Sequence, residues 1–350
     1  MSSKKWVIAL ISITMTVVVL FGALQYYLDP LLQYGGERGP LTFRSYNELY
    51  GNPGIAKNYN YNAVLLGSSI IENTKVGEMN DLFNCNTAKV PYAGGHSYEH
   101  RKILDVCYGS GHRVDKVFWA LDEFALTVDA NTPRWPLPEY LYDDNKINDI
   151  SYLLNLDIFY YYTLQDIKQT LSHKHDTLMM EGTWGDDESI YCMTNALASV
   201  PYPKRQYENK GETFFESELS DNLENNIIPV IENHPETEFH FFLVPYSVLW
   251  WYIAKSDGEL DAHIYDIRTA ISKILEYDNV KVHFFQGDKE IITNLDLYKD
   301  YLHYNPDINS WMLEEMKKES HLLTKGTYNQ TLDEFHNYLI SFDYNALFEG

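Results

Sequence analysis

Cysteine is scarce in this chain of 350 residues. Its three cysteines, Cys85, Cys107 and Cys192, are unevenly spaced and include no Cys-x-x-Cys pair. The sequence therefore predicts neither a zinc site of that kind nor a dense framework of disulfides. Because three thiols form at most one bridge, cysteine usage leaves the redox compartment of the protein open.

Basic residues are also in short supply. The chain has 27 Lys and Arg against 50 Asp and Glu, a net charge of -23. Such an acidic chain repels a phosphate backbone instead of releasing its counterions, so we expect no nucleic-acid partner. The simplest interpretation of the acidity is a solvated surface.

Charge is absent altogether from the segment between Trp6 and Leu28. At ~1.5 Å of helix rise per residue, this run is long enough to cross a ~30 Å hydrocarbon layer. Lys4 and Lys5 precede it and Asp29 follows it, so the positive-inside rule predicts a short cytoplasmic tail and an extracytoplasmic domain. The run is longer than the apolar region of a signal peptide and ends in a poor cleavage site, which favours an uncleaved anchor. Residues 1–28 are thus predicted to be a single-pass membrane anchor.

The anchor leads into a connecting segment. We expect Tyr26 and Tyr27 at the outer interface of the membrane, where amphipathic rings are favoured. Residues 29–60 are rich in Gly, Pro, Asn and Tyr and show no sustained hydrophobic period, which indicates a juxtamembrane segment. The main domain is expected over residues 61–350.

Short apolar strands alternate with helical segments in the main domain. Strands are predicted at 63–66, 87–92, 116–122, 238–247 and 279–286, and helices at 70–83, 97–109, 258–277 and 331–342. This alternation predicts an α/β domain in which helices cover both faces of a parallel sheet. Thr331 is a candidate cap for the last helix.

The alternation lapses between residues 130 and 210. This segment has helical stretches but no clear strand, and it includes the aromatic cluster IFYYY at 158–162. We interpret it as a helical insertion over one end of the sheet. Its tyrosines have three open interpretations: the lining of a glycan groove, a surface that rests on the membrane, and ordinary core.

Two polar segments follow predicted strands, where ligands bind in open α/β sheets. Gly67, Ser68 and Ser69 follow the first strand, at a tight turn into a helix N-terminus whose free N–H groups stabilise an anion. Asp300 and His303 follow the last strand, and their spacing of three places them on one face of a helical turn. Each pattern alone is common, since Gly-Ser-Ser is often only a helix cap. Together they supply the nucleophile, base and orienting carboxylate of nucleophilic catalysis.

These segments resemble the sequence blocks of the SGNH or GDSL-type hydrolases. The similarity lies in GSS after an apolar strand (67–69), in YAGGHSYE (92–99) and in DYLH (300–303), and it covers about residues 60–125 and 236–310. The resemblance implies a three-layer α/β/α, flavodoxin-like fold with five parallel strands.

The resemblance also implies roles for single residues. Ser69, Asp300 and His303 match the catalytic triad of the family, and Ser68 replaces the aspartate that usually precedes the nucleophile. The family's oxyanion hole uses backbone N–H groups, which would here come from Ser69 and Gly94.

One position departs from the family. The third block usually supplies an asparagine, whereas WALDEF places Asp122 and Glu123 there. A carboxylate donates to an oxyanion only when protonated. Either another group completes the hole, for which Asn73 is the candidate, or turnover is poor, and Asp122 is then a cap or a structural acceptor. Gly95 is the alternative to Gly94 in the hole.

The chain is similar to the extracytoplasmic bacterial branch of the family in three features. These are the anchor, the Gly-Ser-Ser variant and the HYNP sequence that includes His303. This branch includes the D-alanine transfer protein of teichoic acid and partners of membrane-bound O-acyltransferases. The resemblance implies a serine-dependent O-acyltransferase or esterase that acts on acyl esters of a cell-surface glycan through an acyl-enzyme, without a cofactor. The alternative is a non-catalytic partner of a membrane O-acyltransferase or glycan export system. A lipase-like esterase ranks lower, because no long apolar lid is evident.

Aromatic residues and histidines elsewhere offer further candidates. Tyr246 and Trp250 follow the fourth strand and are candidates for a substrate-binding wall, with core packing as the alternative. His96 and His100 lie one helical turn apart as a metal-ligand pair, but the sequence as a whole predicts no metal site. The acidic run at 186–188 is interpreted as a solvated loop.

Overall fold

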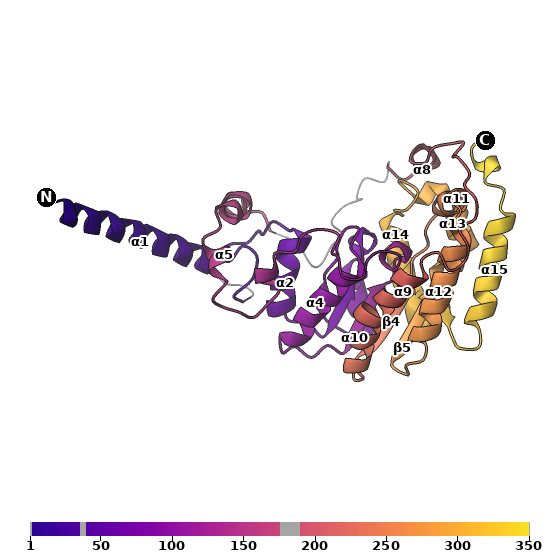
Figure 1. Cartoon of the computed structure of the whole chain (residues 1–350), viewed down its shortest axis with the longest axis horizontal. Coiled ribbons are helices and arrows are strands. Elements are labelled where there is room, and N and C mark those ends of the chain that lie inside the picture. Colours follow the sequence, from indigo (N-terminus) through magenta and orange to yellow (C-terminus); the bar gives the residue numbers. More distant parts are fainter. Residues whose placement is uncertain (1, 36–39, 176–189, 350) are drawn as a thin grey trace. The chain divides into compact units, whose positions relative to one another are not determined.

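The computed structural model describes residues 2–35, 40–175 and 190–349. These residues fall into two compact units (Figure 1). The first unit is built from residues 1–60, 105–112 and 136–178, and the second from 61–104, 113–135 and 179–350. The predicted insertion at 130–210 is therefore not one structural piece, because its central part belongs with the N-terminal segment. The acidic run at 186–188 lies outside the described residues.

The described elements of the first unit include a series of helices. They are α1 (Ser3–Leu28), α2 (Glu48–Asn58), η3 (Glu139–Leu141), α5 (Ile150–Leu153), α6 (Leu156–Ile158), η4 (Phe159–Thr163) and α7 (Leu164–Leu171). Helix α1 is long and apolar enough to cross a membrane. Helix α2 was not predicted, since Pro53 and two glycines hide its periodicity. The side chain of Asn47 caps it by accepting the N–H of Tyr50 at 3.2 Å, a local signal typical of helix starts.

A six-stranded sheet forms the centre of the second unit. Its strands are β1 (Ala63–Leu66), β2 (Thr87–Lys89), β3 (Lys116–Ala120), β4 (Glu238–Leu243), β5 (Val280–Phe284) and β6 (Leu322–Leu323), in the order β2-β1-β3-β4-β5-β6. Strands β1 to β5 pair in parallel, and β6 pairs antiparallel with β5. The sheet is therefore mixed, and the prediction of a purely parallel five-stranded sheet is corrected. Strand β6 has two residues, too few to show an alternating pattern.

Helices cover both faces of this sheet. Phe118 and Trp119 are neighbours on β3, so their side chains point to opposite faces. Phe83 at the end of α3 (Val76–Phe83) packs on Phe118 with ring centroids 4.7 Å apart. On the other face, the indole N–H of Trp119 donates to His100 Nδ1 at 3.2 Å, on α4 (Ser97–Gly109). All four residues of β1 are buried, as expected for a strand covered on both sides.

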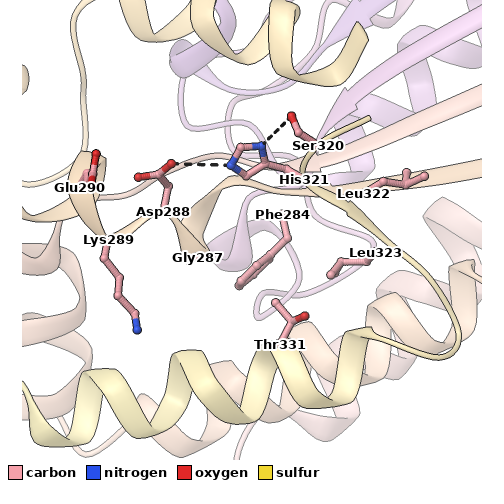
Figure 2. A pocket seen from close by; sticks show the side chains of 10 residues that line it. All are labelled: Phe284, Gly287, Asp288, Lys289, Glu290, Ser320, His321, Leu322, Leu323 and Thr331. Atoms are coloured by element: carbon pink, nitrogen blue, oxygen red, sulfur yellow. Dashed lines mark hydrogen bonds and ion pairs between the residues drawn. The ribbon is translucent and has the colours of Figure 1, made fainter. Parts of the chain in front are cut away.

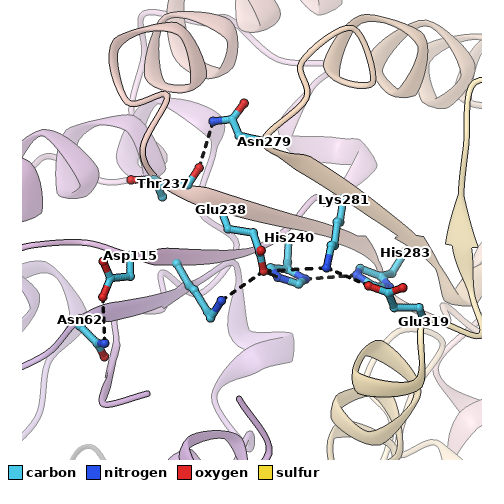
Figure 3. A network of polar contacts seen from close by, with 10 residues as sticks. Asn62, Asp115, Thr237, Glu238, His240, Asn279, Lys281, His283 and Glu319 are labelled. Carbon is cyan, nitrogen blue, oxygen red and sulfur yellow. Dashed lines mark hydrogen bonds and ion pairs between the residues drawn. The ribbon is translucent and has the colours of Figure 1, made fainter. Parts of the chain in front are cut away.

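A ladder of stacked rings crosses the sheet on the Phe118 face. The His240 ring lies 4.6 Å from Phe118 and 5.5 Å from His283, and His240 Nδ1 is 3.3 Å from His283 Nε2. Figure 3 shows Glu238 beside His240, with Lys281 reaching toward the same carboxylate. Burial lowers the pKa of His283 to about 3. Burial also lowers the pKa of His240, against the effect of Glu238, so burial disfavours a charge on both rings.

The remaining helices of the second unit complete the layers. They are η1 (Ser69–Ile71), η2 (Glu123–Ala125), α8 (Met193–Ala198), α9 (Glu216–Asn222), η6 (Leu223–Ile227), α10 (Ile228–Asn233), α11 (Val248–Ser256), α12 (Leu260–Ile274), η7 (Phe285–Gly287), α13 (Lys289–Thr293), η8 (Leu295–Leu297), α14 (Pro306–Lys318), α15 (Tyr328–Ser341) and η9 (Asn345–Leu347). Helix α12 packs against α9, α11 and α15, whereas α14 packs against α3.

Several predicted boundaries change in the structure. The helix predicted at 70–83 is divided into η1 and α3. Helices α11 and α14 were not predicted. Thr331 lies inside α15, whose N-cap residue is Thr327, so the prediction of a Thr331 cap is wrong. The apolar residues of a helix determine its buried face, while its first residue depends on the turn that precedes it.

Candidate active site

Ser69, His303 and Asp300 lie in a hydrogen-bonded row in the second unit. Ser69 Oγ is 2.9 Å from His303 Nε2. On the other side of the ring, His303 Nδ1 is 2.9 Å from Asp300 Oδ2 and 3.1 Å from Oδ1. An Nδ1–H that donates to the carboxylate leaves Nε2 as the acceptor for the serine proton. This is the geometry that a nucleophile, a general base and an orienting carboxylate require.

The corner that carries Ser69 depends on close packing after β1. A Cβ on Gly67 would lie 2.7 Å from the Cβ of Ala120, so only glycine allows this approach of the corner to β3. Ser68 occupies the N-cap position of η1, but its side chain makes no capping hydrogen bond. The interpretation of the serines as helix caps is therefore wrong.

A buried lysine holds the segment that follows Ser69. Lys89 on β2 is 1% exposed, and its ammonium donates to the backbone carbonyls of Glu72 at 2.6 Å and Thr74 at 3.1 Å. These carbonyls belong to the break between η1 and α3. Lys89 thus fixes the chain just beyond the serine.

His303 is presented by a loop instead of the predicted helical turn. An antiparallel bridge between Tyr298 and Tyr304 closes the loop. Inside it, Asp300 Oδ1 accepts the N–H groups of Leu302 at 2.8 Å and His303 at 2.7 Å. Aspartate favours such turns because its side chain bonds the backbone two and three residues on. One carboxylate therefore fixes both the backbone and the ring of His303.

The protonation state of Asp300 follows from these contacts. Burial acts to raise the pKa of its carboxyl group, but the hydrogen bonds and charge of His303 and the backbone N–H groups outweigh it and hold the pKa below its ordinary value. Asp300 is consequently ionised at neutral pH and able to stabilise an imidazolium.

Gly94 and Gly95 of the second block have different backbone contacts. The N–H of Gly95 donates to the carbonyl of Tyr92 at 2.7 Å, which commits it to a turn. Gly94 has a φ of 63°, in the left-handed region that favours glycine. The N–H of Tyr92 in turn donates to the carbonyl of Gly67 at 2.9 Å, which ties this loop to the serine corner. The structure therefore favours Gly94 over Gly95 as the second oxyanion donor.

Asn73 lies in the break between η1 and α3 and is 1% exposed. The next residue, Thr74, donates its hydroxyl to Asn309 Oδ1 on α14 at 3.1 Å. The segment is thus anchored on both sides of Asn73, by Lys89 and by α14. The role of Asn73 as an oxyanion donor stays a prediction.

Asp122 lies beneath the serine corner. It is fully buried and accepts a hydrogen bond from the hydroxyl of Tyr246. Burial raises the pKa of Asp122 to about 6, against the effects of Tyr246, of Ser68 and of the His303 charge. Its side chain makes no capping hydrogen bond to η2. Of the two predicted roles, the structural acceptor is confirmed and the cap is wrong.

The predicted aromatic wall has two different members. Tyr246 is fully buried and its hydroxyl is occupied by Asp122, which favours core packing over contact with a substrate. Trp250 is half-buried and packs on Tyr246 with ring centroids 5.3 Å apart. It is therefore the member of the pair that retains exposed surface.

Glu123 and Gln286 form a buried pair that the sequence analysis missed. The side-chain amide of Gln286 donates to the Glu123 carboxyl group, and both residues are almost completely buried. Burial raises the pKa of Glu123 to about 8, so this carboxyl group is largely protonated at neutral pH. No local pattern signals the pair, because its members are far apart in the chain.

The histidines of the second block do not form the proposed ligand pair. His100 accepts from Trp119, as described above, and burial lowers its pKa to about 4. His96 Nδ1 instead lies 3.1 Å from the carbonyl of Thr132. Within the described ranges, no group of three or more His, Cys, Asp or Glu side chains is placed to hold a metal ion.

A cavity of about 540 Å³ lies beside β5, β6 and α15 and contains none of the three row residues. His321 lies between Asp288 and Ser320 (Figure 2). Its Nε2 is 3.7 Å from Asp288 Oδ2 and its Nδ1 is 3.4 Å from Ser320 Oγ. The hydroxyl of Ser320, however, donates to the carboxylate of Glu315. This cluster therefore lacks the nucleophile and base geometry found at Ser69.

Comparisons with protein-family models, with curated proteins and with solved structures give no match to this chain.

Proposed function

We propose that this protein is a membrane-anchored serine O-acyltransferase or esterase of the SGNH type, acting on acyl esters of a cell-surface glycan. The observation that carries the proposal is the hydrogen-bonded row of Ser69, His303 and Asp300, with 2.9 Å at each of its two junctions. Ser69 precedes His303 by 234 positions in the chain, so the fold brings the nucleophile to the base. Such a row is the arrangement that activates a serine hydroxyl.

The reaction begins when Ser69 Oγ attacks the ester carbonyl carbon and its proton passes to His303 Nε2. Asp300 stabilises the resulting imidazolium. The tetrahedral oxyanion accepts hydrogen bonds from the N–H groups of Ser69 and Gly94, with Asn73 as a third candidate donor. His303 then protonates the departing alkoxide as the ester bond breaks, leaving an acyl group on Ser69. Water, for hydrolysis, or a sugar hydroxyl, for transfer, then attacks the acyl carbon and gives its proton to His303. As the bond between the acyl group and Ser69 Oγ breaks, His303 returns the proton to Ser69 Oγ.

Asp122 affects the efficiency of this reaction. Above a pH of about 6 its carboxyl group is ionised and has no proton to donate to an oxyanion. Its negative charge attracts the positive charge that His303 carries during the reaction but opposes the oxyanion. This balance supports slow turnover, and it is also the observation that favours the second candidate, a non-catalytic partner of a membrane O-acyltransferase or glycan export system.

The strand order supports the family proposal. The strands pair in parallel in the order β2-β1-β3-β4-β5, which supports a flavodoxin-like arrangement, and Ser69 follows the carboxyl end of β1. Strand β6 is an addition at one edge. Helix α1 would hold the protein at the cell membrane, and Lys4 and Lys5 before it support an extracytoplasmic position for the catalytic unit under the positive-inside rule.

Labelling with a fluorophosphonate probe tests the proposal. We expect the full-length protein to be modified at Ser69, and we expect Ser69→Ala and His303→Ala to lose the label. Ser320→Ala, which changes the serine of the other cluster, is the matched control and should label like the unchanged protein. An unreactive Ser69 in folded protein would reject the enzyme and leave the non-catalytic partner.

A further inference from the structure

Large apolar side chains are exposed along one part of the first unit. Their exposed fractions range from 41% to 87%, and they are Ile147, Ile150, Leu156, Tyr160, Tyr161, Leu164 and Leu171. Water-soluble surfaces seldom gather so many in a stretch of this length. A surface of this kind indicates contact with another apolar phase.

The helical run α6, η4 and α7 has an inverted pattern. Leu156, Tyr160 and Leu164 are four residues apart and exposed, so they share one face. Thr163 and Asp166 are fully buried on the inner side. A helix on a soluble core places its apolar residues inside and its polar residues outside. In this run Leu156, Tyr160 and Leu164 face outward while Thr163 and Asp166 face inward, and Ile158 alone of the run's aliphatic residues keeps the usual buried position.

Polar partners inside the first unit explain the inner side. Asp166 Oδ1 accepts both the N–H and the hydroxyl of Ser45 at 2.7 Å. Thr163 donates its hydroxyl to Gln25 Oε1 on α1 at 2.7 Å. Because these contacts hold the polar residues inward, they fix the apolar residues of the run outward.

The contacts with α1 set the depth of the run. The Phe159 ring packs edge-on against Phe21, with ring centroids 5.0 Å apart. Phe21 and Gln25 both lie in the last two turns of α1, within ~10 Å of its end at Leu28 by the rise of a helix. If α1 crosses a bilayer and ends at its outer surface, Phe159 and its neighbours lie at the boundary between headgroups and acyl chains. Amphipathic helices insert ~5–10 Å at that boundary.

We propose that the exposed face of residues 147–171 rests in the outer interface of the lipid bilayer, as a second membrane contact beside α1. This inference rests on the proposed membrane anchor. Exposed tyrosines are favoured at that level, and Lys168 continues the spacing of Leu164 with a side chain able to reach the headgroups. Asp157 is an exposed acid at the start of the run, where it faces the positive end of the helix.

Site-directed spin labelling of the full chain tests the inference. Cysteine is introduced singly as Leu164→Cys, Val18→Cys or Ile340→Cys, with Cys85 and Cys192 replaced by serine and the buried Cys107 retained. Each protein is reconstituted into vesicles of phosphatidylethanolamine and phosphatidylglycerol. The collision rates of the nitroxide with oxygen, which concentrates in lipid, and with a nickel chelate, which stays in water, are then compared.

We expect a higher ratio of oxygen to nickel collisions at Leu164 and Val18 than at Ile340, an exposed apolar residue of α15 in the second unit. A high ratio of oxygen to nickel collisions at Val18 with a low ratio at Leu164 would overturn this inference and leave the anchor intact. That result is expected if a protein partner covers the face. A low ratio at Val18 would instead reject the anchor itself.

Discussion

The imidazole of His303 has two hydrogen-bond partners, and each fixes one property of the base. Asp300 fixes the orientation and tautomer of the ring, while Ser69 lies on the nitrogen that remains. The side chain of His303 is 22% exposed and lies on a loop outside the sheet. Its contacts therefore serve the proposed chemistry more than the stability of the fold.

We expect His303→Ala to lower ester turnover at least about a hundredfold, the usual contribution of a general base, with little change in melting temperature. Ester hydrolysis and thermal unfolding measured on the same sample check both parts. His321→Ala, in the separate cavity, is the control and should retain turnover. A large fall in melting temperature for His303→Ala would show that the residue is structural.

Glu123 is a residue whose titration should be visible in stability. Its pKa is about 8 in the fold, against an ordinary value of 4.5. The folded state therefore keeps a proton that the unfolded state has lost between these values. The contribution of Glu123 to the free energy of unfolding is therefore fully present below a pH of about 4.5. This contribution decreases as the pH rises toward 8, by up to ~1.4 kcal/mol per pH unit.

Glu123→Gln should flatten the dependence of unfolding free energy on pH between about 5 and 8. The amide remains able to hydrogen-bond with Gln286 and does not ionise. Denaturant unfolding at a series of pH values measures the slope. Glu290→Gln, which changes an exposed acid, should leave the slope unchanged, and an equal effect of both variants would contradict the prediction.

Among the elements, the break between η1 and α3 has the greatest influence on the site. The sequence predicted one helix over 70–83, because the apolar residues on both sides of the break suit a helical period. The break is instead stabilised by Lys89 from β2, a contact across chain segments that no local pattern reveals. It sets the position of the chain after Ser69.

We expect Lys89→Met to reduce ester turnover and to destabilise the fold by about 1–3 kcal/mol for each buried carbonyl left without a donor. Methionine has a similar length, so the loss reports the hydrogen bonds more than the packing. Chemical denaturation and hydrolysis assays measure the two effects. Lys116→Met removes a partly exposed ion pair with Glu238 at the start of β3 and β4 and should leave turnover intact. Equal losses in both variants would count against a role for Lys89 at the site.

At the scale of the whole molecule, the distribution of charge separates α1 from the rest of the chain. The chain carries a net charge of -23, yet α1 has no acidic residue and its only charges are Lys4 and Lys5 near its start. This asymmetry predicts the orientation of the protein in a membrane.

We expect a membrane-impermeant maleimide to label Cys192, which is partly exposed, in intact cells. A cysteine introduced as Ser3→Cys should be labelled only after the membrane is permeabilised. Measuring both sites in one preparation compares the two sides directly. Labelling of Ser3→Cys in intact cells without labelling of Cys192 would reverse the proposed orientation.

The sequence by itself determined the features that depend on local pattern. Runs and spacings of residues predicted the length and apolarity of α1 and the existence of strands β1 to β5. They also predicted that Ser69, Asp300 and His303 follow strands. The loop geometry at Asp300 differed from the predicted helical turn, but the pairing of the two residues was predicted by their spacing.

Only the tertiary structure decided which distant groups meet. Three features depend on partners that lie far apart in the chain. They are the hydrogen bond from Tyr246 to Asp122, the buried pair of Glu123 and Gln286, and the outward apolar face of residues 156–164. A side chain's burial is set by what packs against it, and a local pattern of residues carries no information about that neighbour. Of the three interpretations of the tyrosine cluster, ordinary core is wrong for Tyr160 and Tyr161, which are exposed, whereas the glycan groove and the membrane surface stay predictions.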